Sequence, residues 1–93
     1  MAESKIQAQI IRYLQAKGGY VVKVVVATKA GVPDVIACLD GKFYGIEVKD
    51  MKGRLSALQE ANLSLIKAAG GYGIEARSVE DVQFYLDHLD PAS

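Results

Sequence analysis

The sequence contains very few of the residues that build common catalytic and structural centres. Among its 93 residues there is one cysteine, Cys38, and one histidine, His88. A single cysteine excludes a disulfide within the chain, and the apolar neighbours of Cys38 predict a small buried side chain. Neither a zinc site nor a histidine-based catalytic triad can be built from this inventory. Two large classes of enzyme are therefore excluded.

The sequence also lacks long apolar segments. No run approaches the roughly 20 apolar residues that a membrane-spanning helix needs, and no basic segment followed by an apolar one opens the chain. Apolar residues make up 51% of the sequence and charged residues 24%, which is typical of a folded domain. We therefore expect residues 1–93 to form a single cytoplasmic domain with no membrane association.

The formal net charge is zero at pH 7, but the charges are unevenly distributed. Residues 1–54 contain nine Lys or Arg and five Asp or Glu, whereas residues 55–93 contain two and six. A neutral total is compatible with an anionic partner if the basic side chains gather on one face. The first half of the chain is therefore expected to carry any phosphate-binding site.

A β-hairpin pattern occupies residues 31–49. Two segments rich in valine, isoleucine and aromatic residues flank Asp40-Gly41, a dipeptide that readily adopts the positive φ angles of a tight turn. The loop contains two residues if Leu39 and Lys42 close it, or four if Cys38 and Phe43 close it, and both loops give the same strand pairing.

In that pairing Asp34 lies opposite Glu47, and Lys49 follows Glu47 on the same face, roughly 7 Å along the strand. Two carboxylates roughly 5 Å apart repel each other. In the simpler interpretation, Asp34 caps the loop after Pro33, while Glu47 and Lys49 form a solvated strand face. In the alternative, the carboxylates hold a hard cation, Mg²⁺ or Mn²⁺, and Lys49 is directed at a phosphate or an attacking water.

Apolar residues spaced three and four apart predict three helices. They cover residues 4–17, a segment that follows Ser56 and ends near Ala69, and a segment that begins at Ser78 with Asp81 as the partner of its cap. Their buried stripes are predicted to be Ile6, Ile10, Tyr13 and Leu14; Leu58, Ala61, Leu65 and Ala69, widened by Leu63 and Ile66; and Val79, Val82, Leu86 and Leu89.

Two further strands complete the pattern. Residues 20–27 are almost continuously apolar and β-branched, which predicts a strand buried on both faces near the centre of a sheet. Residues 72–76 predict a short fourth strand. Since a long helix separates the third and fourth strands, they are expected to be parallel. The sequence therefore predicts an α/β fold of order αβββαβα with a mixed four-stranded sheet flanked by helices.

Several polar residues near the hairpin have an ordinary structural explanation. Glu3 precedes the first helical turn, where the helix dipole favours a carboxylate. Ser56 and Gln59 form a capping box. Lys52 and Arg54 lie in the polar connector after Lys49, and such a connector is usually a solvated loop.

The ordered set of these residues nevertheless resembles a known family. Pro33-Asp34 followed by Glu47-Val48-Lys49 resembles the Asp…Glu-x-Lys signature of the restriction-endonuclease-like, PD-(D/E)xK, nuclease superfamily. Within it the chain resembles the virus-type replication-repair nuclease domain, VRR-NUC, over nearly its full length. The matching features are Glu3 in an N-terminal helix, Gly31-Val-Pro-Asp34, Gly45-Ile-Glu47-Val-Lys49, and Gly53-Arg-Leu-Ser-Ala-Leu-Gln59.

This resemblance implies a restriction-endonuclease-like core and a metal-dependent endodeoxyribonuclease that hydrolyses DNA phosphodiesters. Asp34, Glu47 and the Val48 carbonyl would hold Mg²⁺ or Mn²⁺, and Lys49 would position the attacking water. Glu3 and Gln59 would complete the catalytic site. In this site role the amide of Gln59 would point at Lys49 or the bound phosphate. The capping role and the site role are expected to exclude each other in one rotamer, and the motif favours the site role.

Stand-alone members of the family resemble homodimeric Holliday-junction resolvases, whereas versions embedded in larger eukaryotic repair proteins act on flaps. We therefore expect a bacterial, phage or viral homodimer that cuts branched DNA such as a four-way junction, with Lys29, Lys52 and Arg54 on the DNA backbone. The widened apolar stripe of the second helix is a further reason to expect a partner. The alternatives are a flap or nicking nuclease, and a non-catalytic module that binds branched DNA.

Overall fold

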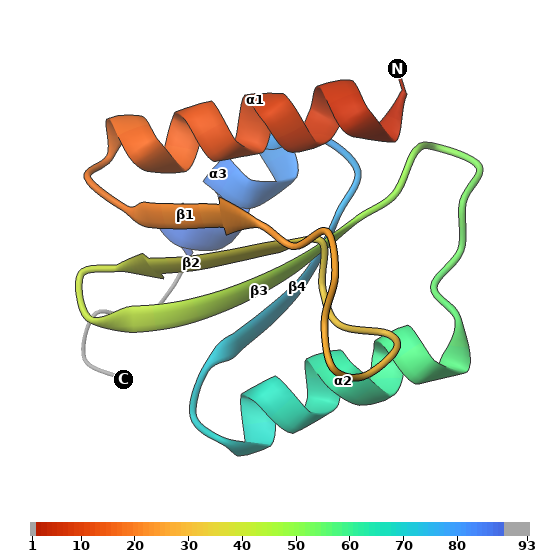
Figure 1. Cartoon of the computed structure of the whole chain (residues 1–93). Helices are drawn as coiled ribbons and strands as arrows, with labels where there is room; N and C mark the ends of the chain where they lie inside the picture. Colours follow the sequence, from red (N-terminus) through yellow and green to blue (C-terminus); the bar gives the residue numbers. More distant parts are fainter. Residues whose placement is uncertain (1, 89–93) are drawn as a thin grey trace.

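The computed structural model describes residues 2–88 as an α/β fold (Figure 1). Along the chain the elements are α1 (Glu3–Ala16), β1 (Tyr20–Lys23), β2 (Val35–Leu39), β3 (Lys42–Val48), α2 (Ala57–Ala68), β4 (Tyr72–Ala76) and α3 (Val79–Asp87). The predicted element order is confirmed. Leu89, which the sequence assigns to the last apolar stripe, lies outside the described residues. No helix within residues 2–88 is long and apolar enough to cross a membrane.

The four strands form one mixed sheet in the order β1-β2-β3-β4. β2 pairs antiparallel with both β1 and β3, whereas β3 and β4 are parallel. The parallel pair requires a crossover connection, and α2 provides it. The predicted mixed topology is confirmed.

The hairpin formed by β2 and β3 has the predicted register. Leu39 pairs with Lys42, and the pairing continues to Val35 opposite Ile46. Asp40 and Gly41 form the loop with φ angles of 53° and 75°. Positive φ at both positions matches the right-handed twist of the strands, which is why Asp-Gly is favoured here.

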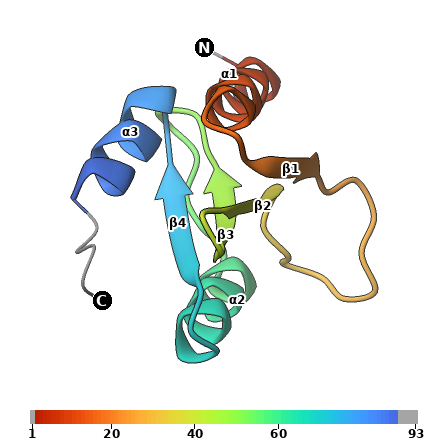
Figure 2. The same ribbon diagram turned by 90° about the vertical axis from the view of Figure 1, so that its left-hand side faces the viewer.

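One face of the sheet, the inner face, packs against α1 and α3 and holds the main core (Figure 2). Alternate residues of each strand point into this core because strand side chains change face at every position. The predicted stripe of α1 is confirmed, with Ile10 and Leu14 fully buried and Tyr13 half-buried. The strand residues of this core are Val35, Ala37, Leu39, Tyr44, Ile46, Val48, Ile74 and Ala76.

The first strand differs from its prediction. β1 ends at Lys23 and lies at the edge of the sheet, so that it pairs with β2 alone. Beyond it the chain becomes a loop in which Val25 and Val26 are 81% and 88% exposed. Figure 2 shows this loop extending away from the sheet. The apolar run was therefore wrongly interpreted as a central strand, because no second neighbour covers it.

The other face of the sheet, the outer face, is covered by α2, and here the predicted stripe of the helix is wrong. Leu58 and Leu65 are 51% and 58% exposed, whereas Asn62 and Leu63 are buried. Two glycines in β3 and β4 explain which side of α2 faces the sheet. A Cβ at Gly73 would lie 2.5 Å from the Leu63 carbonyl oxygen, and one at Gly45 would lie 2.5 Å from Ile66 Cδ1. The helix packs where glycine lets it approach the sheet closely.

Cys38 also lies on the outer face and is exposed. Its neighbours in β2, Ala37 and Leu39, point into the inner core and are buried. The prediction that Cys38 is buried is wrong, because the apolar residues on either side of it belong to the opposite face of the strand.

Candidate functional site

Asp34 and Glu47 meet at one end of the hairpin. Asp34 lies directly before β2, and Glu47 is the second-last residue of β3. Because Val35 pairs with Ile46, one further step of the same register brings Asp34 opposite Glu47, as predicted. The strand alternation directs the Glu47 side chain to the outer face, toward α2.

Asp34 is fixed by main-chain contacts on both sides. The Val48 N–H donates to its Oδ2 at 2.9 Å, and its own carbonyl accepts from the Val24 N–H at 2.8 Å. The second bond closes the base of the exposed loop between β1 and β2. The first bond places the backbone of Val48 directly beside the two carboxylates. Whether the Val48 carbonyl ligates a metal stays a prediction.

Glu47 is a carboxylate in an environment that disfavours its charge. Its residue surface is 2% exposed, and the Oε1 atom is buried without a hydrogen-bond partner. Burial raises the pKa of Glu47 to about 8, and the neighbouring Asp34 carboxyl group adds to this rise. The charge of Lys49 opposes this rise in pKa. Two carboxylates therefore share a site that lacks sufficient positive charge.

Lys49 follows the last residue of β3 and is half-buried. Its N–H donates to the Ala76 carbonyl at 3.0 Å, which continues the ladder toward β4. The two-residue spacing from Glu47 puts both side chains on the outer face. The charge of Lys49 acts on Glu47, so this lysine lies near the two carboxylates.

Gln59 forms the predicted cap of α2 and also contacts a carboxylate of the candidate site. Its Oε1 accepts from the Ser56 N–H at 2.9 Å, and its N–H donates to Ser56 Oγ at 3.1 Å, which completes the capping box of α2. Its Nε2 donates to Glu47 Oε2 at 3.5 Å. The acceptor and donor ends of one amide point to different partners, so the cap does not keep Gln59 away from the carboxylates. A contact of Gln59 with Lys49 or a phosphate stays a prediction.

Glu3 lies at the border of the site. It occupies the first turn of α1, and its Oε2 accepts from the Asp50 N–H at 3.5 Å. Its negative charge contributes to the raised pKa of Glu47. The structure therefore places Glu3 beside the segment after Lys49, near the carboxylate pair.

The three predicted DNA-contacting residues are exposed and come from two different loops. Lys52 and Arg54 belong to the connector that follows Lys49. Lys29 belongs to the loop before β2 and lines an apolar groove beside Asn62. Their contact with DNA stays a prediction.

The structure adds polar residues that the sequence did not single out. Asn62 Nδ2 donates to the Leu58 carbonyl at 2.9 Å and to the Ala30 carbonyl at 3.3 Å, which fixes the loop before Asp34 to α2. Asp50 accepts from two main-chain N–H groups of the connector, and these bonds lower the pKa of its carboxyl group. The spacing of Asp50 and Gly53 is a turn signal that could have been noticed in the sequence.

The carboxylate pair fits a hard cation. The like charges of Asp34 and Glu47, the buried Oε1 of Glu47 without a partner and the oxygen-only donor set all match what Mg²⁺ or Mn²⁺ requires. Within residues 2–88 there is no group of three or more His, Cys, Asp or Glu side chains that could hold a metal. A two-carboxylate site of this kind leaves coordination positions for water and phosphate oxygens.

Comparisons with known proteins give the same fold. A solved structure described as a VRR_NUC domain is 23% identical, with 95% of this chain and 97% of that chain covered and a TM-score of 0.81. A VRR_NUC domain protein is 17% identical, with coverages of 94% and 86% and a TM-score of 0.74. Archaeoglobus fulgidus Hjc, a Holliday junction resolvase from an archaeal hyperthermophile, is 21% identical, with coverages of 81% and 70% and a TM-score of 0.59. None of the curated proteins matches.

The restriction-endonuclease-like fold expected from the VRR-NUC resemblance is therefore confirmed. The sequence model of the family described as archaeal Holliday junction resolvase (Hjc) matches residues 3–76. This match includes the hairpin with Asp34, Glu47 and Lys49, as well as Glu3 and Gln59. The chain belongs to the archaeal Holliday junction resolvase (Hjc) family of nucleases.

Proposed function

We propose that the chain is a metal-dependent, structure-selective DNA endonuclease that acts as a homodimeric Holliday-junction resolvase. The observation that carries the proposal is Glu47, a buried carboxylate that faces Asp34, has Lys49 on the same face and has one oxygen without a partner. Membership of the family supports nuclease chemistry. The likeness to a solved Holliday junction resolvase supports a four-way junction as the substrate.

Asp34 and Glu47, with the Val48 carbonyl, would hold Mg²⁺ or Mn²⁺. When bound, the ion would activate water as a nucleophile and stabilise negative charge on the phosphate. Gln59 contacts Oε2 of Glu47, which leaves Oε1 as the oxygen available for a ligand. The bond from the Val48 N–H holds the Asp34 carboxylate in place before any ligand arrives.

Lys49 supplies the positive charge of the site. As a half-buried residue two positions after Glu47, Lys49 would orient the attacking water. It would also stabilise the charge that develops on the phosphate in the transition state. Glu3, at the border of the site, would help to hold the connector that follows Lys49. Lys52 and Arg54 lie in this connector and would contact the DNA backbone, with Lys29 reaching it from the loop before β2.

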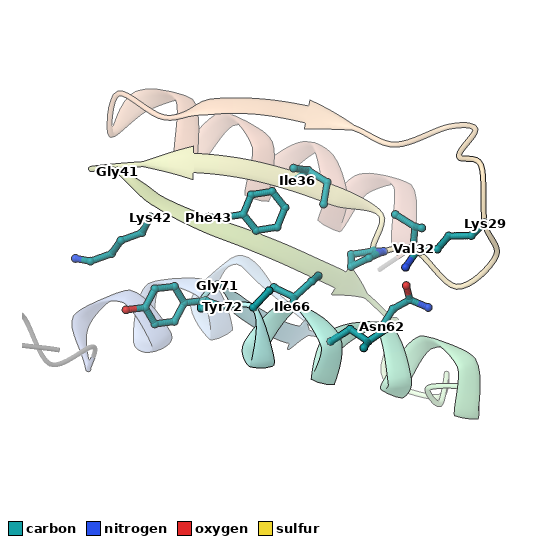
Figure 3. A pocket seen from close by; sticks show the side chains of 14 residues that line it. Lys29, Val32, Ile36, Gly41, Lys42, Phe43, Asn62, Ile66, Gly71 and Tyr72 are labelled. Atoms are coloured by element: carbon teal, nitrogen blue, oxygen red, sulfur yellow. The ribbon is translucent and has the colours of Figure 1, made fainter.

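A second copy of the chain would cover the apolar part of the outer face. A groove of about 700 Å³ lies between the strands and α2, lined by apolar residues that include Pro33, Ile36, Phe43, Leu65 and Ile66 (Figure 3). Tyr20 and Val22 of β1 are also exposed on this face. Closed two-fold dimers are the commonest assembly of soluble proteins, and two copies would bring two sites to one junction.

Cleavage of a panel of branched DNAs in Mg²⁺ tests the proposal. The panel contains a mobile four-way junction, a 5′ flap, a 3′ flap, a nicked duplex and an intact duplex, and Asp34→Asn serves as the inactive control. We expect symmetric paired cuts in the junction and little cleavage of the intact duplex. Faster cleavage of flaps or nicks would mean that one of these DNAs, and not the four-way junction, is the preferred substrate. Junction binding without any metal-dependent cleavage would instead indicate a non-catalytic module.

A further inference from the structure

The connector between β3 and α2, residues 49–56, has no regular secondary structure although it carries three of the predicted site residues. These residues are Lys49, Lys52 and Arg54. Figure 1 shows the connector as a long loop that extends beyond the end of the sheet before it returns to α2. Beyond the bond from the Lys49 N–H to Ala76, no ladder of main-chain bonds fixes this loop, so its other backbone groups need individual partners. The side chains of Asp50 and Arg77 provide three of these partners.

The side chain of Asp50 folds the connector into a turn. Its Oδ1 accepts from the Lys52 N–H at 2.9 Å and from the Gly53 N–H at 2.7 Å. Gly53 is thereby brought against Lys49, since a Cβ at Gly53 would lie 3.3 Å from the Cδ of Lys49. The turn therefore packs against the stem of the active-site lysine.

The main chain of Asp50 is fixed from two other elements. Its N–H donates to Glu3 Oε2 of α1 at 3.5 Å, and its carbonyl accepts from Nη1 of Arg77. Arg77 directly follows β4, and the last residue of that strand, Ala76, accepts from the Lys49 N–H at 3.0 Å. Lys49 and Asp50 are therefore both attached to the end of β4.

The guanidinium of Arg77 has two partners. While Nη1 donates to the Asp50 carbonyl, Nη2 contacts Glu75 Oε2 at 2.6 Å. Within residues 2–88 this is the one ion pair. The planar guanidinium can donate in two fixed directions at once, which a single ammonium group does less well. Glu75 thus orients the arginine that holds the connector.

We propose that Asp50 and Arg77 are positioning residues, a clamp that holds the connector so that Lys49 stays beside Glu47 and Lys52 and Arg54 face the same DNA backbone. The inference rests on the proposed nuclease function. Neither side chain touches the reacting phosphate. The clamp acts through Lys49, and displacing a catalytic group by about 1 Å can reduce a rate by about 100-fold.

The test compares Arg77→Met and Asp50→Ala with the wild-type chain in two measurements. The first is the single-turnover rate of junction cleavage at saturating enzyme, together with the junction Kd. We expect the rate to fall by about 10-fold or more and Kd to change by less than about threefold. The second is the NMR order parameter of the Lys52 and Gly53 amides without DNA. It should fall from about 0.85 to below about 0.6, while the order parameters of the strands stay unchanged.

Three control variants make the test specific. Arg12→Met removes the same side chain from an exposed position of α1 and should retain the wild-type rate and order parameters. Asp50→Asn keeps the acceptor oxygen of the turn and should retain most of the rate. Arg77→Lys should recover part of the loss, because it restores one donor.

Unchanged order parameters in Arg77→Met and Asp50→Ala would overturn the clamp. An equal loss of rate in Arg12→Met would also overturn it, because the effect would then be one of charge. A loss of order throughout the sheet would overturn it as well, because the effect would then be one of general stability. If the wild-type chain cleaves no branched DNA, the proposed function fails. The order parameters would still decide whether the clamp exists.

Discussion

The two faces of the sheet are built in different ways. On the inner face, α1 and α3 cover apolar side chains such as Val35 and Ile46, which are fully buried. On the outer face, α2 covers part of the sheet, so that Phe43 stays partly exposed while the carboxylate of Glu47 is buried. Burying apolar groups stabilises the fold, whereas burying an unpaired carboxylate destabilises it. The difference separates the half of the molecule that holds the main core from the half that holds the candidate site.

The largest difference between the faces should appear when one buried side chain is shortened. Ile10 is completely buried in the inner core, and Ile10→Ala should lower the free energy of unfolding by about 2 to 5 kcal/mol because it leaves a cavity. Leu65→Ala on the exposed side of α2 should change it by less than about 0.5 kcal/mol at a concentration where the chain is monomeric. Urea denaturation of both variants measures the contrast. Equal losses would mean that α2 seals its face as completely as α1 does.

Lys49 should matter for the reaction and little for stability. Lys49→Ala should lower the single-turnover cleavage rate of a four-way junction by about 100-fold or more, the scale expected when one preorganised donor is lost. Its free energy of unfolding should change by at most about 0.5 kcal/mol. Arginine should restore little activity, because its planar group does not deliver a compact ammonium to one water. Lys52→Ala is the control, and a loss as large as that of Lys49→Ala would contradict the assignment.

The buried carboxylate makes the outer face sensitive to pH in the absence of metal. The pKa of Glu47 is about 8 in the folded chain, raised from 4.5. A raised folded-state pKa stabilises the protein fully below the unfolded value, and this contribution is lost as pH rises through the folded value. In EDTA, the Tm should therefore fall by several degrees between about pH 5 and pH 8. Glu47→Gln should flatten this pH dependence, and a wild-type Tm that rises over the same range would refute the explanation.

A bound metal ion should stabilise the outer face by balancing the negative charges of Asp34 and Glu47. Millimolar Mg²⁺ or Mn²⁺ should raise the Tm of the wild-type chain, because a ligand that binds only the folded state shifts the equilibrium toward it. Asp34→Asn should lose most of this increase, yet be at least as stable as wild type without metal. Calorimetry with and without the ion gives both values. The same increase in wild type and variant would rule out the carboxylate pair as the metal site.

Leu65→Lys is expected to have the smallest effect on the stability of the folded chain, although it should disrupt the dimer. Leu65 lines the apolar groove and is 58% exposed, so the variant should fold normally and dissociate the dimer. Phe84→Lys, on the exposed side of α3, should leave assembly unchanged. Light scattering at micromolar concentrations measures the mass. A wild-type chain that is monomeric and still makes paired cuts would exclude both the dimer and its interface.

Several features of the site were predictable because they depend on neighbours in the sequence. Asp40-Gly41 sets the turn, the turn sets the register, and the register brings Asp34 to Glu47 with Lys49 on the same face. Likewise Ser56 and Gln59 cap α2 through contacts within one helical turn. The family resemblance added the chemical meaning of these residues, which the pattern alone left open.

Burial of a residue by an element distant in the sequence could not be predicted from neighbouring residues. The apolar run after β1 looked like a central strand, but no neighbouring strand covers Val25 and Val26. The buried side of α2 depends on where Gly45 and Gly73 let the helix approach the sheet, and the sequence of α2 does not contain that information.

The sequence by itself determined the order of the elements, the hairpin register and the set of polar residues at its end, because turn chemistry and strand alternation act over a few residues. Only the tertiary structure decided that Glu47 is buried enough to raise its pKa. It also decided that Arg77, 27 residues from Asp50, donates a hydrogen bond to the carbonyl of Asp50. Desolvation and long-range hydrogen bonds depend on which groups the packed layers bring together, and local sequence rules do not specify those contacts.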